Sequence, residues 1–182
     1  MLKIKKTELH LIKDENNWED LGLDLQKGIL LMGNIGVGKT TIINEYLNTK
    51  WFNPLSGKVK TGHRLNQREL NSDFKRYQNY ESIKHYYMFI DDLADQGKTN
   101  IKVYGEIKNP ASDLIALRYN VFVSEIRWDE SDGFNYFTSN YSLDNLAEEL
   151  GGSIVDRLYE MCNFIEVGGT SWRSGNLNGK IN

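Results

Sequence analysis

The chain has 182 residues, of which 40% are hydrophobic and 26% are charged, so length and composition suit one globular domain around a single core. Its one cysteine, Cys162, excludes an intramolecular disulfide and a cysteine-based zinc cluster, and we expect it in the core. No apolar run approaches the roughly 20 residues of a membrane helix, and the first ten residues lack the apolar stretch of a secretory signal. The sequence therefore predicts a cytoplasmic protein with no membrane partner.

The formal net charge of −3 hides an uneven distribution of charged residues. Residues 57–76 carry six Lys or Arg against two acids, whereas residues 129–160 carry eight acids against Arg157 alone. The basic segment predicts contact with a polyanion such as single-stranded DNA. Its candidate DNA-binding residues are Lys58, Lys60, Arg64 and Arg68, with Tyr77 and Tyr80 next to them as candidate stacking surfaces. The alternative interpretation is that both segments are only solvated helix faces.

Strand and helix patterns alternate along residues 27–182, after a polar N-terminal extension at residues 1–26. The expected strands span residues 28–32, 58–61, 85–90, 134–138 and 163–167. The expected helices span residues 39–48, 67–80, 111–119, 143–150 and 152–161. This alternation predicts an α/β fold, in which a parallel sheet carries helices on both faces.

A phosphate-binding loop follows the first of these strands. The pattern G-x-x-x-x-G-K-[ST] is matched by Gly33, Asn34, Ile35, Gly36, Val37, Gly38, Lys39 and Thr40, and Thr41 extends the predicted nucleotide contact. Glycines let the backbone N–H groups turn inward toward phosphate oxygens, and the following helix adds its positive dipole end. Lys39 would then contact the β and γ phosphates, and the Thr40 hydroxyl would be a ligand of Mg²⁺. The alternative is a glycine-rich turn with an accidental Lys-Thr pair.

Polar residues end two later strands. Asp91 and Asp92 follow the apolar strand at 85–90, where Asp91 predicts an Mg²⁺ contact and Asp92 predicts a group that orients or deprotonates the attacking water. Asn140 follows the strand at 134–138, where it could position water near the γ-phosphate or simply belong to a turn.

Together these segments resemble the AAA+ domain of DnaC-type helicase loaders, a group that includes the IstB-like transposition ATPases. The resemblance runs from about Lys27 to Arg173, and its segments are 28–40, 89–93, 117–119, 137–140, 147–151, 156–158 and 171–173. It implies a P-loop NTPase fold of the AAA+ type and an ATPase domain at residues 27–182. By position it also implies that Asn140 is sensor I, Arg157 is an arginine finger offered to a neighbouring subunit, and Arg173 is the sensor II arginine.

The resemblance implies an ATPase that uses ATP and Mg²⁺, assembles as a homo-oligomer on single-stranded DNA, and loads or remodels a replicative DNA helicase. An IstB-like protein would assist a transposase instead. Asp92 stands where AAA+ proteins often carry Glu, which predicts slow hydrolysis, and only nine residues follow Arg173, which predicts a reduced or absent lid. Two other classes stay open, a small P-loop kinase and a nucleotide-gated binding module with negligible turnover.

Overall fold

In the computed structural model, the described residues are 1–53, 58–59, 62–72, 87–95, 99–124 and 134–172. Six strands form one sheet in the order β1-β10-β2-β9-β6-β5, and every neighbouring pair in it is parallel. The strands are β1 (Leu2–Lys5), β2 (Gly28–Gly33), β5 (Gly62–Asn66), β6 (Tyr87–Asp91), β9 (Asn135–Ser139) and β10 (Cys162–Gly168). The expected α/β fold with a parallel sheet is therefore confirmed.

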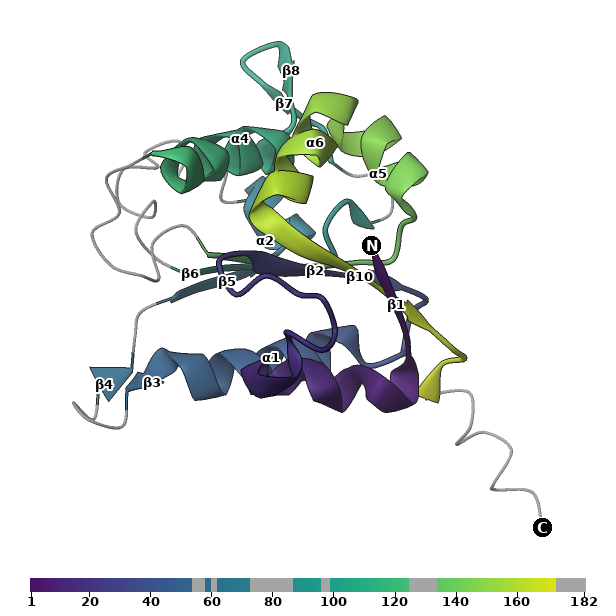
Figure 1. Ribbon diagram of the computed structural model, residues 1–182. Helices are drawn as coiled ribbons and strands as arrows, with labels where there is room; N and C mark the ends of the chain where they lie inside the picture. The colour runs from purple at the N-terminus through teal and green to yellow at the C-terminus, as the bar shows by residue number, and fades with distance from the viewer. Residues whose placement is uncertain (54–57, 60–61, 73–86, 96–98, 125–133, 173–182) are drawn as a thin grey trace.

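Helices cover both faces of this sheet (Figure 1). On one face lie α1 (Lys39–Trp51) and the 3₁₀ helix η1 (Lys6–Lys13), with the short η2 (Glu15–Asn17) after it. On the other face lie α2 (Gln67–Ser72), α4 (Pro110–Val123), α5 (Leu143–Leu150) and α6 (Gly152–Met161). Among the described helices, none combines the length and the apolar character needed to cross a membrane.

The buried strands separate two hydrophobic clusters. In β2, Ile29 and Leu31 belong to the cluster on the α1 side, and Leu30 and Met32 belong to the cluster on the α4–α6 side. All four side chains are at most 3% exposed. Such a continuous apolar run is what a parallel strand needs when helices cover both of its faces. Cys162 lies in the core, as expected.

The N-terminal segment packs on the same core. Strand β1 pairs with β10 at the edge of the sheet, although the sequence pattern did not indicate a strand there. Leu9 and Ile12 of η1 are buried, and Trp18 stacks on Tyr46 of α1 with ring centroids 5.7 Å apart. The boundary at residue 26 stays a prediction, and the described residues before it share one sheet with those after it.

Several predicted boundaries differ from the structure. Of the strand predicted at 58–61, the structure describes Lys58–Val59 as strand β4, which pairs with Phe52–Asn53 (β3) in a separate small sheet, and residues 60–61 lie outside the described residues. The main sheet takes β5 instead. The helix predicted at 67–80 is described only as far as Ser72, and its remainder lies outside the described residues. A second antiparallel pair, β7 (Ile101–Val103) and β8 (Glu106–Lys108), was not expected from the sequence.

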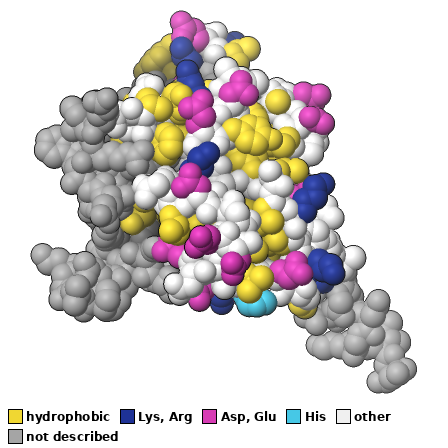
Figure 2. Space-filling view, in the orientation of Figure 1, with side chains coloured by type: hydrophobic (Ala, Val, Ile, Leu, Met, Phe, Trp, Pro, Cys, Tyr) yellow, Lys and Arg dark blue, Asp and Glu magenta, His cyan; other side chains and the backbone are white. Residues whose placement is uncertain are grey.

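Acidic side chains are spread over the face seen in Figure 2, including the part occupied by α5 and α6. On these two helices Asp144, Glu148, Asp156 and Glu160 are all exposed. This part of the predicted acidic segment is therefore a solvated helix surface.

Candidate active site

The predicted phosphate-binding loop lies between β2 and α1, at the carboxyl end of the sheet. Gly33, Gly36 and Gly38 all have positive φ, at 145°, 80° and 101°. A Cβ at Gly33 would collide with the carbonyl oxygen of Val167, and one at Gly36 would collide with the hydroxyl of Ser171. Glycine is thus needed at Gly33 and Gly36 for two reasons, because the backbone has positive φ and because other atoms occupy the space of a side chain.

Lys39 begins α1 and is only 5% exposed. Its Nζ donates hydrogen bonds to the carbonyl oxygens of Gly33 at 2.7 Å and Asn34 at 3.0 Å, and to Oδ1 of Asn140 at 2.8 Å. Burial lowers the pKa of Lys39, and the carboxylates of Asp92 and Asp91 partly oppose that shift. These three acceptors match the three donors of an ammonium group, so the side chain is held in place across the loop.

Asp91 ends β6 and faces the start of α1. Its Oδ1 accepts a hydrogen bond from the Thr40 hydroxyl at 2.7 Å and another from the Thr138 hydroxyl on β9. The Thr40 and Asp91 oxygens are the hard ligands that Mg²⁺ takes from proteins beside substrate phosphates. The two residues therefore fit the predicted magnesium site.

Asp92 follows in a left-handed backbone conformation, with φ at 53°. Its N–H donates to the Thr138 hydroxyl at 2.9 Å, and its Oδ1 accepts from Nδ2 of Asn140 at 3.3 Å. Burial raises the pKa of Asp92, and Asp91 and Asp95 raise it further, while Lys39 and the Asn140 hydrogen bond lower it. A carboxylate with a raised pKa is better suited to accept a proton from water.

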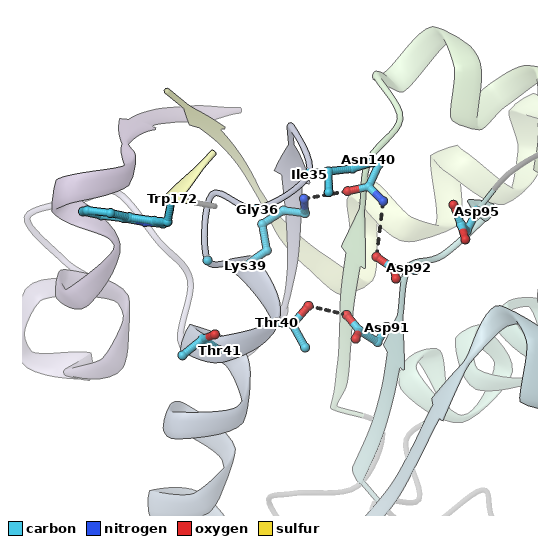
Figure 3. Close-up of a pocket in the computed structure, with 11 residues that line it drawn as sticks. Ile35, Gly36, Lys39, Thr40, Thr41, Asp91, Asp92, Asp95, Asn140 and Trp172 are labelled. Carbon is cyan, nitrogen blue, oxygen red and sulfur yellow. Dashed lines mark hydrogen bonds between the residues drawn. The ribbon is translucent and has the colours of Figure 1, made fainter. Parts of the chain in front are cut away.

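Strand β9 is placed between β2 and β6, so Asn140 at its end lies between Lys39 and Asp92 (Figure 3). Its side-chain oxygen accepts from Lys39 and its nitrogen donates to Asp92. The structure therefore brings together three residues that the sequence predicted from three separate segments. Thr138 forms hydrogen bonds with both acids, but the sequence indicated it only as part of a strand end, because its partners lie at the end of β6, far away in the sequence.

These groups line a cavity of about 540 Å³ (Figure 3). Its walls are formed by Ile35, Gly36, Gly38, Lys39, Thr40, Thr41, Asp91, Asp92, Asp95, Asn140 and Trp172. A volume of this size is in the range of small-ligand pockets. Asp95 and Trp172 had no predicted role, although Trp172 stands inside the 171–173 segment.

The other predicted loop residues, Gly33, Asn34 and Val37, are not among those that line this cavity. Val37 is fully buried. Gly33 and Asn34 bind Lys39 through their carbonyl groups, and they also line a second cavity of about 480 Å³ on which Asn140 borders.

Comparison with known proteins gives structural matches only. No protein-family model matches the chain, and no curated protein matches it in sequence. A DnaC helicase loader matches with a TM-score of 0.54 and 21% identity, over 79% of this chain and 79% of that one. DnaA from Aquifex aeolicus bound to AMPPCP matches with a TM-score of 0.56 and 14% identity, over 91% of this chain and 48% of that one. Domain III of the Thermotoga maritima replication initiation protein DnaA matches with a TM-score of 0.54 and 12% identity, over 88% of this chain and 67% of that one.

The chain has the AAA+ fold. Within this fold, Arg157 lies on α6, is half-buried, and has its guanidinium 5.4 Å from the ring centroid of Tyr119 on α4. It is not among the residues that line the described cavity, and the Tyr119 hydroxyl donates to Glu160 at 2.7 Å. The arginine-finger role of Arg157 stays a prediction. Arg173 lies outside the described residues.

The predicted DNA-binding residues are not brought into one described patch. Lys60 lies outside the described residues, and for Lys58 the structure describes only the strand. Arg64 is exposed on β5, with its guanidinium 5.8 Å from the Phe89 ring centroid. Arg68 instead borders a cavity of about 210 Å³ whose walls include Asp91, Asp92 and Asp95.

Proposed function

We propose that this chain is a Mg²⁺-dependent ATPase of the AAA+ type. The observation that carries the proposal is the bridge from Lys39 through Asn140 to Asp92, directly beside the Thr40–Asp91 pair. It brings a phosphate-binding cation, a water-positioning amide, a candidate base and two oxygen ligands for Mg²⁺ into one cavity. A self-contained kinase would also need an acceptor site, and no described feature of the cavity points to one.

Each side chain has a role in this proposal. The N–H groups of the loop and the Lys39 ammonium would bind the phosphates, and Thr40 and Asp91 would hold Mg²⁺, which would supply positive charge to stabilise the phosphates. Asn140 orients the attacking water, and Asp92 accepts its proton. Because Asp92 is one methylene shorter than Glu, we expect turnover to be slow.

The test is ATP binding by Lys39→Ala, measured by calorimetric titration with Mg²⁺. We expect the variant to fold and to lose detectable binding, because it lacks the main cation of the phosphate site. Lys13→Ala is the matched control, since Lys13 is also a lysine whose ammonium has a partner in the folded chain, but it lies on the surface in an ion pair with Glu45 at 2.7 Å. Unchanged affinity in Lys39→Ala would refute the phosphate-loop assignment.

We propose further that the protein assembles, and that Arg157 of one subunit completes the ATP site of the next. Arg157 is half-buried on α6 and is not among the residues that line the described cavity of its own chain, which supports this assignment. An arginine finger contributes about 10³–10⁵ in rate in P-loop enzymes. Arg157→Ala should therefore bind ATP but hydrolyse it poorly, and mixing it with Lys39→Ala should restore part of the activity.

The mixing experiment also separates the AAA+ machine from a self-contained enzyme. In mixed assemblies, the intact loop of an Arg157→Ala subunit can meet the intact Arg157 of a Lys39→Ala subunit. Specific activity of the wild type should rise with protein concentration. If activity is independent of concentration and mixing gives no rescue, Arg157 acts within its own chain or has no role in hydrolysis.

As partners we propose single-stranded DNA and a replicative DNA helicase, with a transposase as the alternative. The likeness of the fold to a DnaC helicase loader and the exposed Arg64 on β5 support this proposal. Phosphate release measured with and without single-stranded DNA tests the DNA contact, and stimulation that falls with added salt is the expected result.

A further inference from the structure

We propose that Trp172 is the platform on which the base of the bound nucleotide stacks, an inference that rests on the proposed ATP-binding function. Nothing in the sequence pattern gives Trp172 this role. The proposal follows from its place in the cavity, from the way its ring is held, and from its exposure.

The cavity has two chemically different ends (Figure 3). Asp92 and Asp95 lie at one end, Trp172 lies at the other, and Lys39 and Thr40 lie between them. A nucleoside triphosphate is an extended molecule whose terminal phosphate and base are at opposite ends. With the terminal phosphate beside Lys39 and the water-activating Asp92, the sugar and base point toward Trp172.

The indole is positioned before any ligand arrives. The backbone N–H of Trp172 donates to the carbonyl oxygen of Gly36 at 2.9 Å, which ties the residue to the phosphate loop. The Lys6 ammonium lies 4.1 Å from the ring centroid and donates to the carbonyl oxygen of Thr170 at 2.9 Å. A preorganised aromatic ring loses little conformational freedom on binding, so more of the contact energy remains as affinity.

Trp172 is 54% exposed, which is unusual for a tryptophan that is fixed on both its backbone and its ring. The Lys6 cation uses one ring face, and the exposed area leaves room for a flat ligand. Stacking of a base on an aromatic side chain contributes about 1–3 kcal/mol for any base, because every base has a π face. We therefore expect the contact to increase affinity for nucleotides in general rather than to choose between them.

Inorganic tripolyphosphate separates base stacking from simple support of the loop, because it offers the phosphates of ATP without a base. Dissociation constants for ATP and for tripolyphosphate, both with Mg²⁺, should be measured by calorimetry for the wild type, Trp172→Ala and Trp172→Phe. Tyr104→Ala is the control, since Tyr104 is an aromatic residue 91% exposed on the β7–β8 hairpin.

Trp172→Ala should weaken ATP binding by about 5- to 100-fold and leave tripolyphosphate binding within about twofold of the wild type. Trp172→Phe should retain most of the ATP affinity, and Tyr104→Ala should change neither constant. The fluorescence of Trp172 is the difference between the tryptophan fluorescence of the wild type and that of Trp172→Phe. We expect ATP to change this difference and tripolyphosphate to leave it unchanged.

Four results would overturn the proposal. An equal loss for both ligands would mean that Trp172 only supports the phosphate loop. An unchanged ATP affinity in Trp172→Ala, or an equal fluorescence response to both ligands, would mean that no base stacks there. If the wild type binds neither ligand, the phosphate site itself is absent and the proposed function fails with it.

Discussion

Thr138→Val is expected to destabilise the protein and to loosen both acids of the site at once. The Thr138 side chain is fully buried, donates to Oδ1 of Asp91 and accepts from the N–H of Asp92. Valine has nearly the same shape, so the change removes the hydroxyl without opening a cavity. Losing a hydrogen bond to a charged group lowers the free energy of unfolding by about 1.5–3 kcal/mol, and leaving a buried N–H unsatisfied lowers it by about 1–3 kcal/mol. Because Asp91 keeps its bond from Thr40 and Asp92 is only partly buried, we expect roughly 2–4 kcal/mol in total.

Urea denaturation of the wild type, Thr138→Val and Thr138→Ser measures this loss. Serine keeps the hydroxyl and removes one methyl group, so it should lose only about 0.5–1.5 kcal/mol. Calorimetric titration should also show weaker binding of Mg²⁺·ATP to Thr138→Val than to Thr138→Ser. If Thr138→Val lowers the free energy of unfolding by less than about 0.5 kcal/mol, the reasoning is refuted, because substitutions of exposed residues without special contacts have effects of that size.

Two further predictions concern the loop and the candidate base. Gly36→Ala should destabilise the chain by about 1–3 kcal/mol more than Gly22→Ala, because both glycines have positive φ but only a Cβ at Gly36 collides with Ser171; equal losses on denaturation would contradict the clash. Since the pKa of Asp92 is raised by burial, Asp91 and Asp95, the folded chain binds this proton more tightly than the unfolded chain, and stability falls as pH rises above about 4. Asp92→Asn should therefore be more stable than the wild type at about pH 7, by less than about 1 kcal/mol because the group is partly solvated, and the gain should vanish at about pH 3. If denaturation shows the same gain at both pH values, the carboxylate charge is not its cause.

The sequence predicted most accurately those helices and strands whose bounds depend on residues close by in the chain. β2 was expected at 28–32 and found at Gly28–Gly33, and α6 was expected and found at Gly152–Met161. In β2 a short apolar run ends at a glycine turn, and in α6 the apolar residues Ile154, Val155, Leu158 and Met161 repeat at helical spacing. Such signals depend only on neighbours along the chain.

The edges of the sheet were harder to predict, because they depend on distant partners. β1 has only four residues, and its pairing with β10 brings Leu2 beside Ile165. Its one buried residue, Ile4, gives a weak alternating pattern in Leu2–Lys5 that is also compatible with a surface segment. On the opposite edge, β5 has mostly polar residues and so lacks the apolar pattern of a strand, although its backbone pairs with β6 over five positions.

The same distinction separates the predicted from the unpredicted residues of the site. Lys39, Asp91 and Asn140 each stand at a fixed distance from a strand end, so local sequence suffices to propose them. Thr138 and Trp172 act through residues that only the folded chain brings near, namely Asp91 and Asp92 for the first and Gly36 and Lys6 for the second. A threonine in a strand and a tryptophan near a chain end have no local pattern that indicates such contacts.

The charges of the cavity lead to one last consequence of this arrangement. Among its lining residues Lys39 is the single cation, facing the carboxylates of Asp91, Asp92 and Asp95. The field that a triphosphate meets there is therefore repulsive at one end, and burial makes that repulsion stronger than it would be in water. A divalent cation held by Asp91 would turn the nearest repulsive contact into an attractive one, so we expect the proposed site to bind a triphosphate tightly only when Mg²⁺ is present. In the proposed function, the carboxylates that repel an anion without the metal are also the groups that would hold Mg²⁺, through Asp91, and accept a proton from water, through Asp92.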